Sequence, residues 1–105
     1  MDALEGLLEG IEGKDLLRFR KGEILFSQGT EARDIYFIQT GKVRVTVNSP
    51  QNKEAILAML GPHDFLGEGS LVGDSLRTTT ATSLEPSTAI RIEKDAMIRA
   101  LHASG

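Results

Sequence analysis

The feature that most constrains this chain is an alternation of apolar with other residues that begins at Leu16 and recurs in short runs. A period of two places apolar side chains on one face of an extended strand. Turn-forming residues interrupt the runs at 21–22, 28–30, 40–41, 48–50 and 61–62. Many short strands separated by regular turns favour an antiparallel β-sandwich or β-roll over a parallel sheet.

Helical patterns flank this strand region at both ends. Three-and-four spacing of apolar residues predicts a short N-terminal helix over 1–13 and a closing helix over 94–103. We place the β-roll at 15–93, with a long hairpin formed by 43–47 and 55–59. The alternation puts Ile56, Ala58 and Leu60 on one face of its second strand, and residues 78–84 form another strand-like run. The 105 residues are enough for one compact domain, so we expect a single mainly β (α+β) domain over 1–105.

Composition excludes several classes of protein. The chain has no cysteine, which rules out disulfides, thiolate metal sites and a cysteine nucleophile and fits a cytoplasmic location. The net charge is −3 and no Arg/Lys cluster is present, so direct contact with nucleic acid is not expected. No apolar run is long enough for a membrane span, and no signal peptide opens the chain.

A metal-dependent enzyme on a small β-barrel is a poor fit to the sequence. Such a site needs two or more histidines and a carboxylate on facing strands. The chain has only His63, in a turn, and His102, in the closing helix. We therefore expect no metal, no cofactor and no enzymatic activity.

Residues 62–82 carry the pattern of a pocket for a small phosphate-bearing ligand. Gly67, Gly69 and Gly73 allow the backbone to approach a guest closely, and residues 70–72 could start a short helix whose N–H groups face an anion. Glu68 and Arg77 add one acid and one base. A cation for phosphate and a carboxylate for a sugar hydroxyl suit a ligand that is half phosphate and half ribose.

Structural interpretations of the same residues stay open at this point. Glu68 and Arg77 could form a structural ion pair at a turn. The glycines could mark turns and nothing more. The glycine spacing also misses the dinucleotide-binding fingerprint by one residue and lacks a βαβ context, so that interpretation is not favoured.

The order of these motifs resembles the cyclic nucleotide-binding domain, in the form found in the N-terminal sensor domain of CRP/FNR-family bacterial transcription regulators. The resemblance covers residues 12 to 101 and rests on FRKGEILF (19–26), QG (28–29), IYFI (35–38), GKV (41–43), GPHDFLGE (61–68) and RTTT (77–80). It implies an antiparallel β-roll (jelly roll) of about eight strands with short flanking helices, and a phosphate-binding cassette within 65–78.

The resemblance also implies roles for single residues. Glu68 would accept a hydrogen bond from the ribose 2′-hydroxyl, and Arg77 would pair with the exocyclic oxygens of the cyclic phosphate. The backbone N–H of Ser70 and the hydroxyl of Thr78 would reach the ligand as well, and Gly67 would lie against the ribose. The implied ligand-binding set is Gly67, Glu68, Gly69, Ser70, Arg77 and Thr78.

The function that follows is a non-catalytic sensor that binds a cyclic nucleotide, cAMP before cGMP, and relays binding to a C-terminal output. In an intact CRP/FNR-type regulator that output is DNA binding by a homodimer, through a helix-turn-helix domain that this chain lacks. The chain therefore resembles an excised sensor domain or a short stand-alone one. The alternatives are the sensor of a channel or kinase, and a degenerate β-roll that keeps the fold for protein contacts and binds no cyclic nucleotide.

Overall fold

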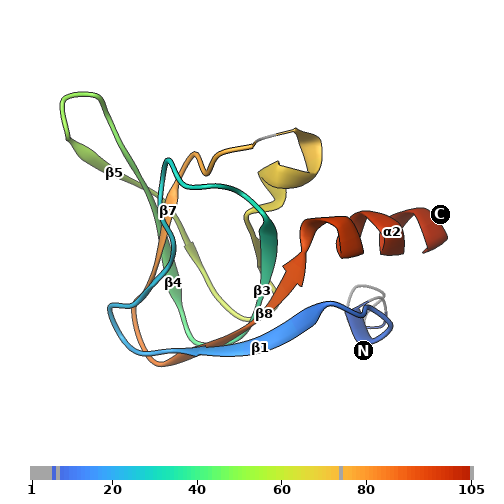
Figure 1. Ribbon diagram of the computed structural model, residues 1–105. Helices are drawn as coiled ribbons and strands as arrows, with labels where there is room; N and C mark the ends of the chain where they lie inside the picture. The colour runs from blue at the N-terminus through green and yellow to red at the C-terminus, as the bar shows by residue number, and fades with distance from the viewer. Residues whose placement is uncertain (1–5, 7, 74, 105) are drawn as a thin grey trace.

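The computed structural model describes residues 6, 8–73 and 75–104, and these residues form an antiparallel β-roll closed by a helix (Figure 1). Eight strands lie within the described residues. In chain order they are β1 (Lys14–Phe19), β2 (Ile24–Phe26), β3 (Asp34–Thr40), β4 (Val43–Asn48), β5 (Glu54–Leu60), β6 (Phe65–Leu66), β7 (Thr80–Ser83) and β8 (Ser87–Glu93). A 3₁₀ helix, η1 (Glu68–Val72), follows β6, and the α-helix α2 (Lys94–Ser104) follows β8. The expected class and architecture are confirmed.

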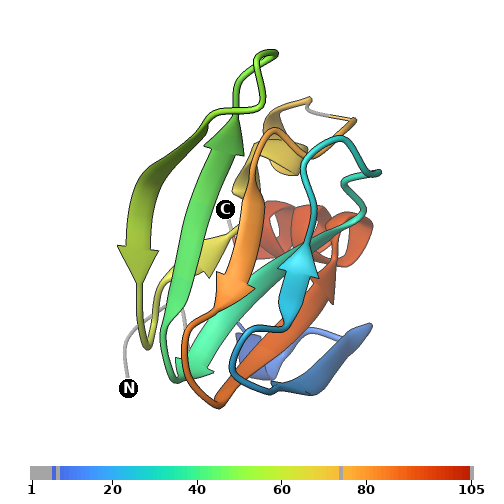
Figure 2. The same cartoon turned by 90° about the vertical axis from the view of Figure 1, so that its left-hand side faces the viewer.

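The strands form two four-stranded sheets that face each other. The first has the order β1-β8-β3-β6, and the second, seen face-on in Figure 2, has the order β2-β7-β4-β5. All pairings between these strands are antiparallel. The expected hairpin is β4 with β5, whose register runs from Val43 opposite Leu60 to Asn48 opposite Glu54.

The apolar residues of β3 divide between two cores, which explains why this strand is apolar at consecutive positions. Tyr36 and Ile38 point between the two sheets, into the core cluster that also contains Phe26. Ile35 and Phe37 point to the other side, into a second cluster that α2 covers with Ala96 and Met97. Because both faces of β3 are buried, both carry apolar side chains, and the strand shows no alternation with polar residues.

The alternation predicted for β5 is wrong in its first half. Ile56, which the period of two places on the inner face, is 57% exposed, and its neighbour Leu57 is 58% exposed. The register of β4 and β5 shifts between Val45 and Thr46, so that Ala58 and Ile56 face consecutive residues and Leu57 is the extra one. A bulge of this kind moves the following side chains relative to the face that the sequence pattern assigns.

The two terminal helices are described to different extents. The closing helix runs over Lys94–Ser104, one residue past the range that we expected. Part of the N-terminal helix expected over 1–13, residues 1–5 and 7, lies outside the described residues; residues 6, 8 and 9 are helical, and the chain has left the helix by Ile11. No helix among the described residues has the length and apolar character that a membrane span requires.

Candidate functional site

Arg77 is held by its backbone against the turn that follows β2. Its N–H donates to the carbonyl of Thr30 (2.7 Å), and its carbonyl accepts from the N–H of Gly29 (2.8 Å). An isolated bridge between Glu31 and Leu76 fixes the residue before it. These contacts leave the side chain inside the roll, where Arg77 is only 7% exposed.

The guanidinium of Arg77 lies between elements of both sheets. Nη2 donates to the backbone carbonyl of Asp34 on β3 at 2.7 Å, and Cζ lies 4.3 Å from the centre of the Phe26 ring on β2. Nε and Nη1 are buried and have no hydrogen-bond partner among the described residues. Leaving a buried donor unsatisfied costs about 1–3 kcal/mol, and more when the group is charged. A cation with two such donors is the kind of group that an anionic ligand satisfies.

Burial changes the pKa values of Arg77 and Tyr36, in opposite directions. It lowers the pKa of Arg77, and the neighbouring Tyr36 and Asp34 offset part of that effect. An arginine starts so far above neutrality that it stays protonated in proteins. Burial likewise raises the pKa of Tyr36, which is therefore a neutral phenol; its hydroxyl donates a long hydrogen bond of 3.4 Å to the carbonyl of Leu25.

The chain passes directly over the guanidinium at Gly67. This residue has φ of 78°, in the left-handed region, and precedes η1. A Cβ atom at this position would collide with Nη1 of Arg77 and would lie 3.3 Å from the carbonyl oxygen of Asp34. Only glycine combines this backbone angle with so close an approach. The structure thus brings together Gly67 and Arg77, two of the residues that the sequence singled out.

The other candidate residues lie around this contact. Glu68 is the first residue of η1 and is exposed. The short helix therefore begins two residues earlier than the predicted 70–72, and Gly69 and Ser70 lie inside it. Thr78 is exposed and precedes β7, which is shorter than the strand that we expected over 78–84.

Glu68 and Arg77 do not form the structural ion pair that the sequence left open. The guanidinium donates only to the Asp34 carbonyl among the described residues, and no carboxylate of those residues lies within ion-pair distance of it. The interpretation of these two residues as an ion pair at a turn is wrong. The Glu68 side chain is exposed, and the Arg77 side chain, nine positions later, is buried.

Sequence reasoning missed the groups that surround the guanidinium: Phe26, Asp34 and Tyr36. Apolar alternation identified Phe26 and Tyr36 as strand or core residues and nothing more, and Asp34 acts through its backbone carbonyl, which no residue type reveals. Phe26 is placed by the pairing of β2 with β7, where it lies opposite Ala81, whereas Asp34 and Tyr36 come from β3 in the other sheet. Such long-range register is not readable from one sequence.

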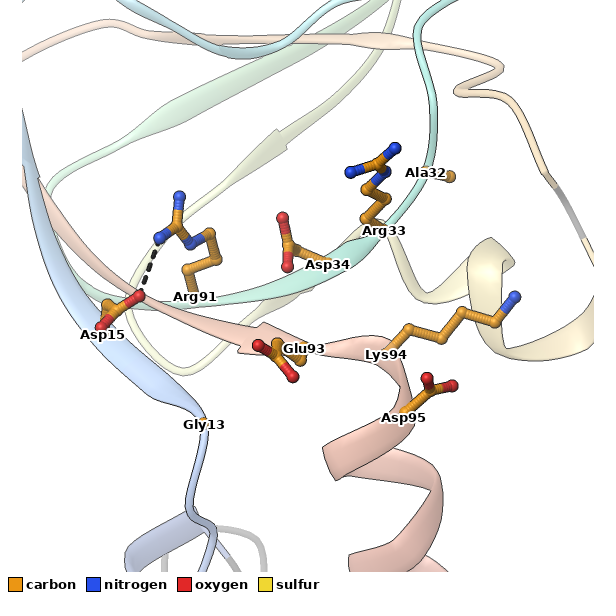
Figure 3. A pocket seen from close by; sticks show the side chains of 9 residues that line it. All are labelled: Gly13, Asp15, Ala32, Arg33, Asp34, Arg91, Glu93, Lys94 and Asp95. Atoms are coloured by element: carbon orange, nitrogen blue, oxygen red, sulfur yellow. Dashed lines mark hydrogen bonds and ion pairs between the residues drawn. The ribbon is translucent and has the colours of Figure 1, made fainter.

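A hollow elsewhere on the domain, shown in Figure 3, is a poorer candidate for an anionic ligand. This cleft of about 560 Å³ lies where β1, β3 and β8 meet the start of α2. Its lining mixes acids and bases: Asp15, Asp34, Glu93 and Asp95 with Arg33, Arg91 and Lys94. Arg91 is already paired with Asp15 at 2.7 Å. Among the described residues, no group of three histidine, aspartate or glutamate side chains could hold a metal ion in this cleft or elsewhere.

Comparison with known proteins points to one family. The family model of the cyclic nucleotide-binding domain matches residues 16–104. The chain is 28% identical over 104 residues to the CRP-like cAMP-activated global transcriptional regulator of Mycobacterium tuberculosis, covering 90% of this chain and 46% of that protein. It is also 39% identical over 61 residues to a cGMP-dependent protein kinase of Drosophila melanogaster, covering 57% of this chain and 6% of the kinase.

Structural comparison agrees on the fold. The crystal structure of the Thermus thermophilus catabolite activator protein superposes with a TM-score of 0.84 and 23% identity, covering 95% of this chain and 46% of that one. At this identity the likeness concerns the fold alone. The chain spans about half the length of the first curated relative it matches.

Proposed function

Because this chain belongs to the family of cyclic nucleotide-binding domains, whose members are regulatory sensor domains, we propose that it binds cAMP at 67–78 and acts as a non-catalytic sensor. The family implies a cyclic nucleotide as the ligand. The choice of cAMP over cGMP follows the cAMP-activated regulator, which matches 90% of this chain, whereas the cGMP-dependent kinase matches 57%.

The observation that carries the proposal is the buried guanidinium of Arg77 with two unpartnered donors beside Gly67. A cyclic phosphodiester has one negative charge, and at ~4 Å and an effective dielectric near 20 its attraction to one cation is ~4 kcal/mol before desolvation. The planar fork of a guanidinium also matches two phosphate oxygens, which an ammonium cannot do. One buried cation therefore suits one phosphodiester.

The remaining roles follow from position. Glu68 cannot serve the phosphate, because like charges repel, so its partner in the proposal is the ribose 2′-hydroxyl. It is one residue from Gly67, whose backbone lies over the guanidinium. The backbone N–H of Ser70 and the hydroxyl of Thr78 complete the proposed contacts, with Gly67 and Gly69 allowing the backbone close to the ligand.

The position of η1 offers a route from the ligand to the rest of the domain. This short helix contacts both β3 and α2. Nε and Nη1 of Arg77 are buried, so the phosphate reaches them only after the segment over them has moved. A nucleotide that favours one position of η1 would therefore shift the population of α2 positions. We propose that this shift is the signal, read by an output such as DNA binding in a homodimer, in a part of the protein outside this chain.

Calorimetric titration with cAMP and cGMP tests the proposal. We expect saturable binding of cAMP with a dissociation constant below about 10 μM, or roughly −7 kcal/mol. Arg77→Met should abolish it, whereas Arg91→Met, which removes a surface arginine paired with Asp15, should leave it unchanged. No heat with either nucleotide at millimolar concentration, or full binding by Arg77→Met, would refute the assignment.

A further inference from the structure

We propose that Phe26 is a positioning residue that holds the guanidinium of Arg77 in place for the phosphate. The proposal rests on the proposed function for its ligand, and on the geometry of the core for its mechanism. Phe26 lies outside the cassette and stands 51 positions before Arg77 in the sequence. The interior of the roll brings the two side chains together.

The contact has the geometry of a cation–π interaction. Cζ of Arg77 lies 4.3 Å from the ring centroid, inside the ~6 Å range over which a cation is attracted by the face of an aromatic ring. Both residues are more than nine-tenths buried, with Phe26 8% and Arg77 7% exposed. Little water therefore screens the attraction.

The ring is itself fixed by its neighbours, so it can serve as a rigid support. Its centroid lies 5.8 Å from that of Tyr36, and the ring of Tyr36 in turn meets Phe19 edge-on at 6.5 Å. The three aromatic residues come from β2, β3 and β1, and thus from both sheets. The guanidinium lies over Phe26, the member of this group of three rings that comes from β2.

The ring and the phosphate use different parts of the guanidinium and do not compete. The face of the ring attracts the positive charge centred on Cζ, whereas a phosphate accepts hydrogen bonds from individual N–H donors. Nη2 is already used by the Asp34 carbonyl, and Nε and Nη1 have no hydrogen-bond partner among the described residues. Phe26 therefore orients the donors without consuming them, which lowers the ordering cost when the ligand binds.

An aliphatic side chain would fill the same space without this effect. In that case the charge would lose its attraction to the ring face, and the guanidinium would be held by the Asp34 hydrogen bond alone. A positioning role therefore depends on the negative potential of the ring face, whereas a packing role depends only on the shape of the side chain. The two roles can be tested separately by changing the potential while keeping the shape.

Fluorinated phenylalanines at position 26 make that separation. Successive fluorination weakens the negative potential of the ring face while nearly preserving its shape, so a packing role predicts no trend. We expect the affinity for cAMP to fall steadily with fluorine number, by about 5- to 30-fold between phenylalanine and the fully fluorinated ring. The same series at Phe37, which lies in the other core cluster, should leave the affinity unchanged.

Phe26→Leu and a measurement without nucleotide complete the test. In nuclear magnetic resonance spectra, ring currents should shift the side-chain resonances of Arg77 in the wild type, and the shift should disappear in Phe26→Leu. An affinity that stays constant across the fluorinated series would overturn the positioning role. Arg77 resonances indifferent to Phe26→Leu would overturn the contact itself. If the wild type bound no cAMP, the proposed function would fail, and the resonances would still decide whether the ring holds the arginine.

Discussion

Arg77 carries its charge at a place where the charge costs the folded state free energy. The side chain is 7% exposed, two of its donors lack partners among the described residues, and burial lowers its pKa. Taking an unpaired charge out of water costs several kcal/mol, a penalty that an apolar residue of similar size does not carry. A costly buried ion with unused hydrogen-bonding capacity is what the proposed phosphate-binding role of Arg77 requires.

Arg77→Met should therefore stabilise the domain in the absence of nucleotide. We expect the free energy of unfolding to rise by about 1 kcal/mol, because the apolar side chain removes the desolvation penalty and the unpaired donors. Urea denaturation followed by circular dichroism measures this change. A loss of stability in Arg77→Met larger than that in the surface variant Arg91→Met would contradict the account.

Gly67→Ala should damage binding through the position of the guanidinium. The added methyl group would occupy space next to Nη1 of Arg77, and φ of 78° adds backbone strain. We expect the affinity for cAMP to fall at least ~10-fold, equivalent to ~1.4 kcal/mol.

The matched control is Gly22→Ala. That residue has φ of 88°, but nothing lies within 4 Å of its added Cβ, so it shares the strain without the collision. Calorimetry on both variants separates the two effects. Equal affinities in the two variants would show that contact between Gly67 and Arg77 has no part in binding.

At the scale of single elements, alternation and turn residues were enough to predict most of the fold. The hairpin of β4 and β5 and the closing helix α2 follow from local patterns, because each depends on side chains near in sequence. The bulge between Val45 and Thr46 was not predictable, since a register shift depends on how two strands meet. For that reason the pattern predicted the wrong face for Ile56.

The candidate site shows the same difference between features that depend on local sequence and features that depend on long-range packing. Gly67, Glu68 and Arg77 were found because a short motif joins them, and the structure brings Gly67 to Arg77. The ring of Phe26 and the carbonyl of Asp34 come from β2 and β3, and only the packing of the two sheets places them on the guanidinium. Local patterns singled out the residues of the proposed cassette, whereas the groups around the Arg77 guanidinium could be seen only in the fold.

Two isoleucines on strands test the corrected burial of β5. Ile38 on β3 is fully buried and Ile56 on β5 is 57% exposed. We expect Ile38→Ala to lower the free energy of unfolding by about 2–5 kcal/mol. Ile56→Ala should cost less than about 1 kcal/mol, because little apolar surface leaves a packed environment. Urea denaturation of both variants checks this, and comparable losses would contradict the exposure of β5.

At the scale of the whole molecule, η1 connects the candidate site to the terminal helix. It follows β6 at the edge of the first sheet and contacts both β3 and α2 (Figure 1). A change at the cassette therefore has a physical path to the C-terminal end of the domain. The tip of the β4–β5 hairpin lies apart from this path, at the edge of the second sheet (Figure 2).

Hydrogen exchange with and without cAMP tests that path. Binding should slow exchange in η1 and in α2, because both become ordered around the ligand, and should leave residues 49–53 at the hairpin tip unchanged. Mass spectrometry of proteolytic peptides measures all three segments in one experiment. Protection confined to the cassette, with α2 unaltered, would contradict the proposed relay.

A crystal structure of the domain grown with cAMP tests the central claim most directly. We predict the cyclic phosphate within hydrogen-bonding distance, about 2.7–3.2 Å, of Nε or Nη1 of Arg77, with Cζ of Arg77 still over the Phe26 ring. A nucleotide bound in the mixed-charge cleft of Figure 3, with the two donors of Arg77 still unpaired, would contradict it.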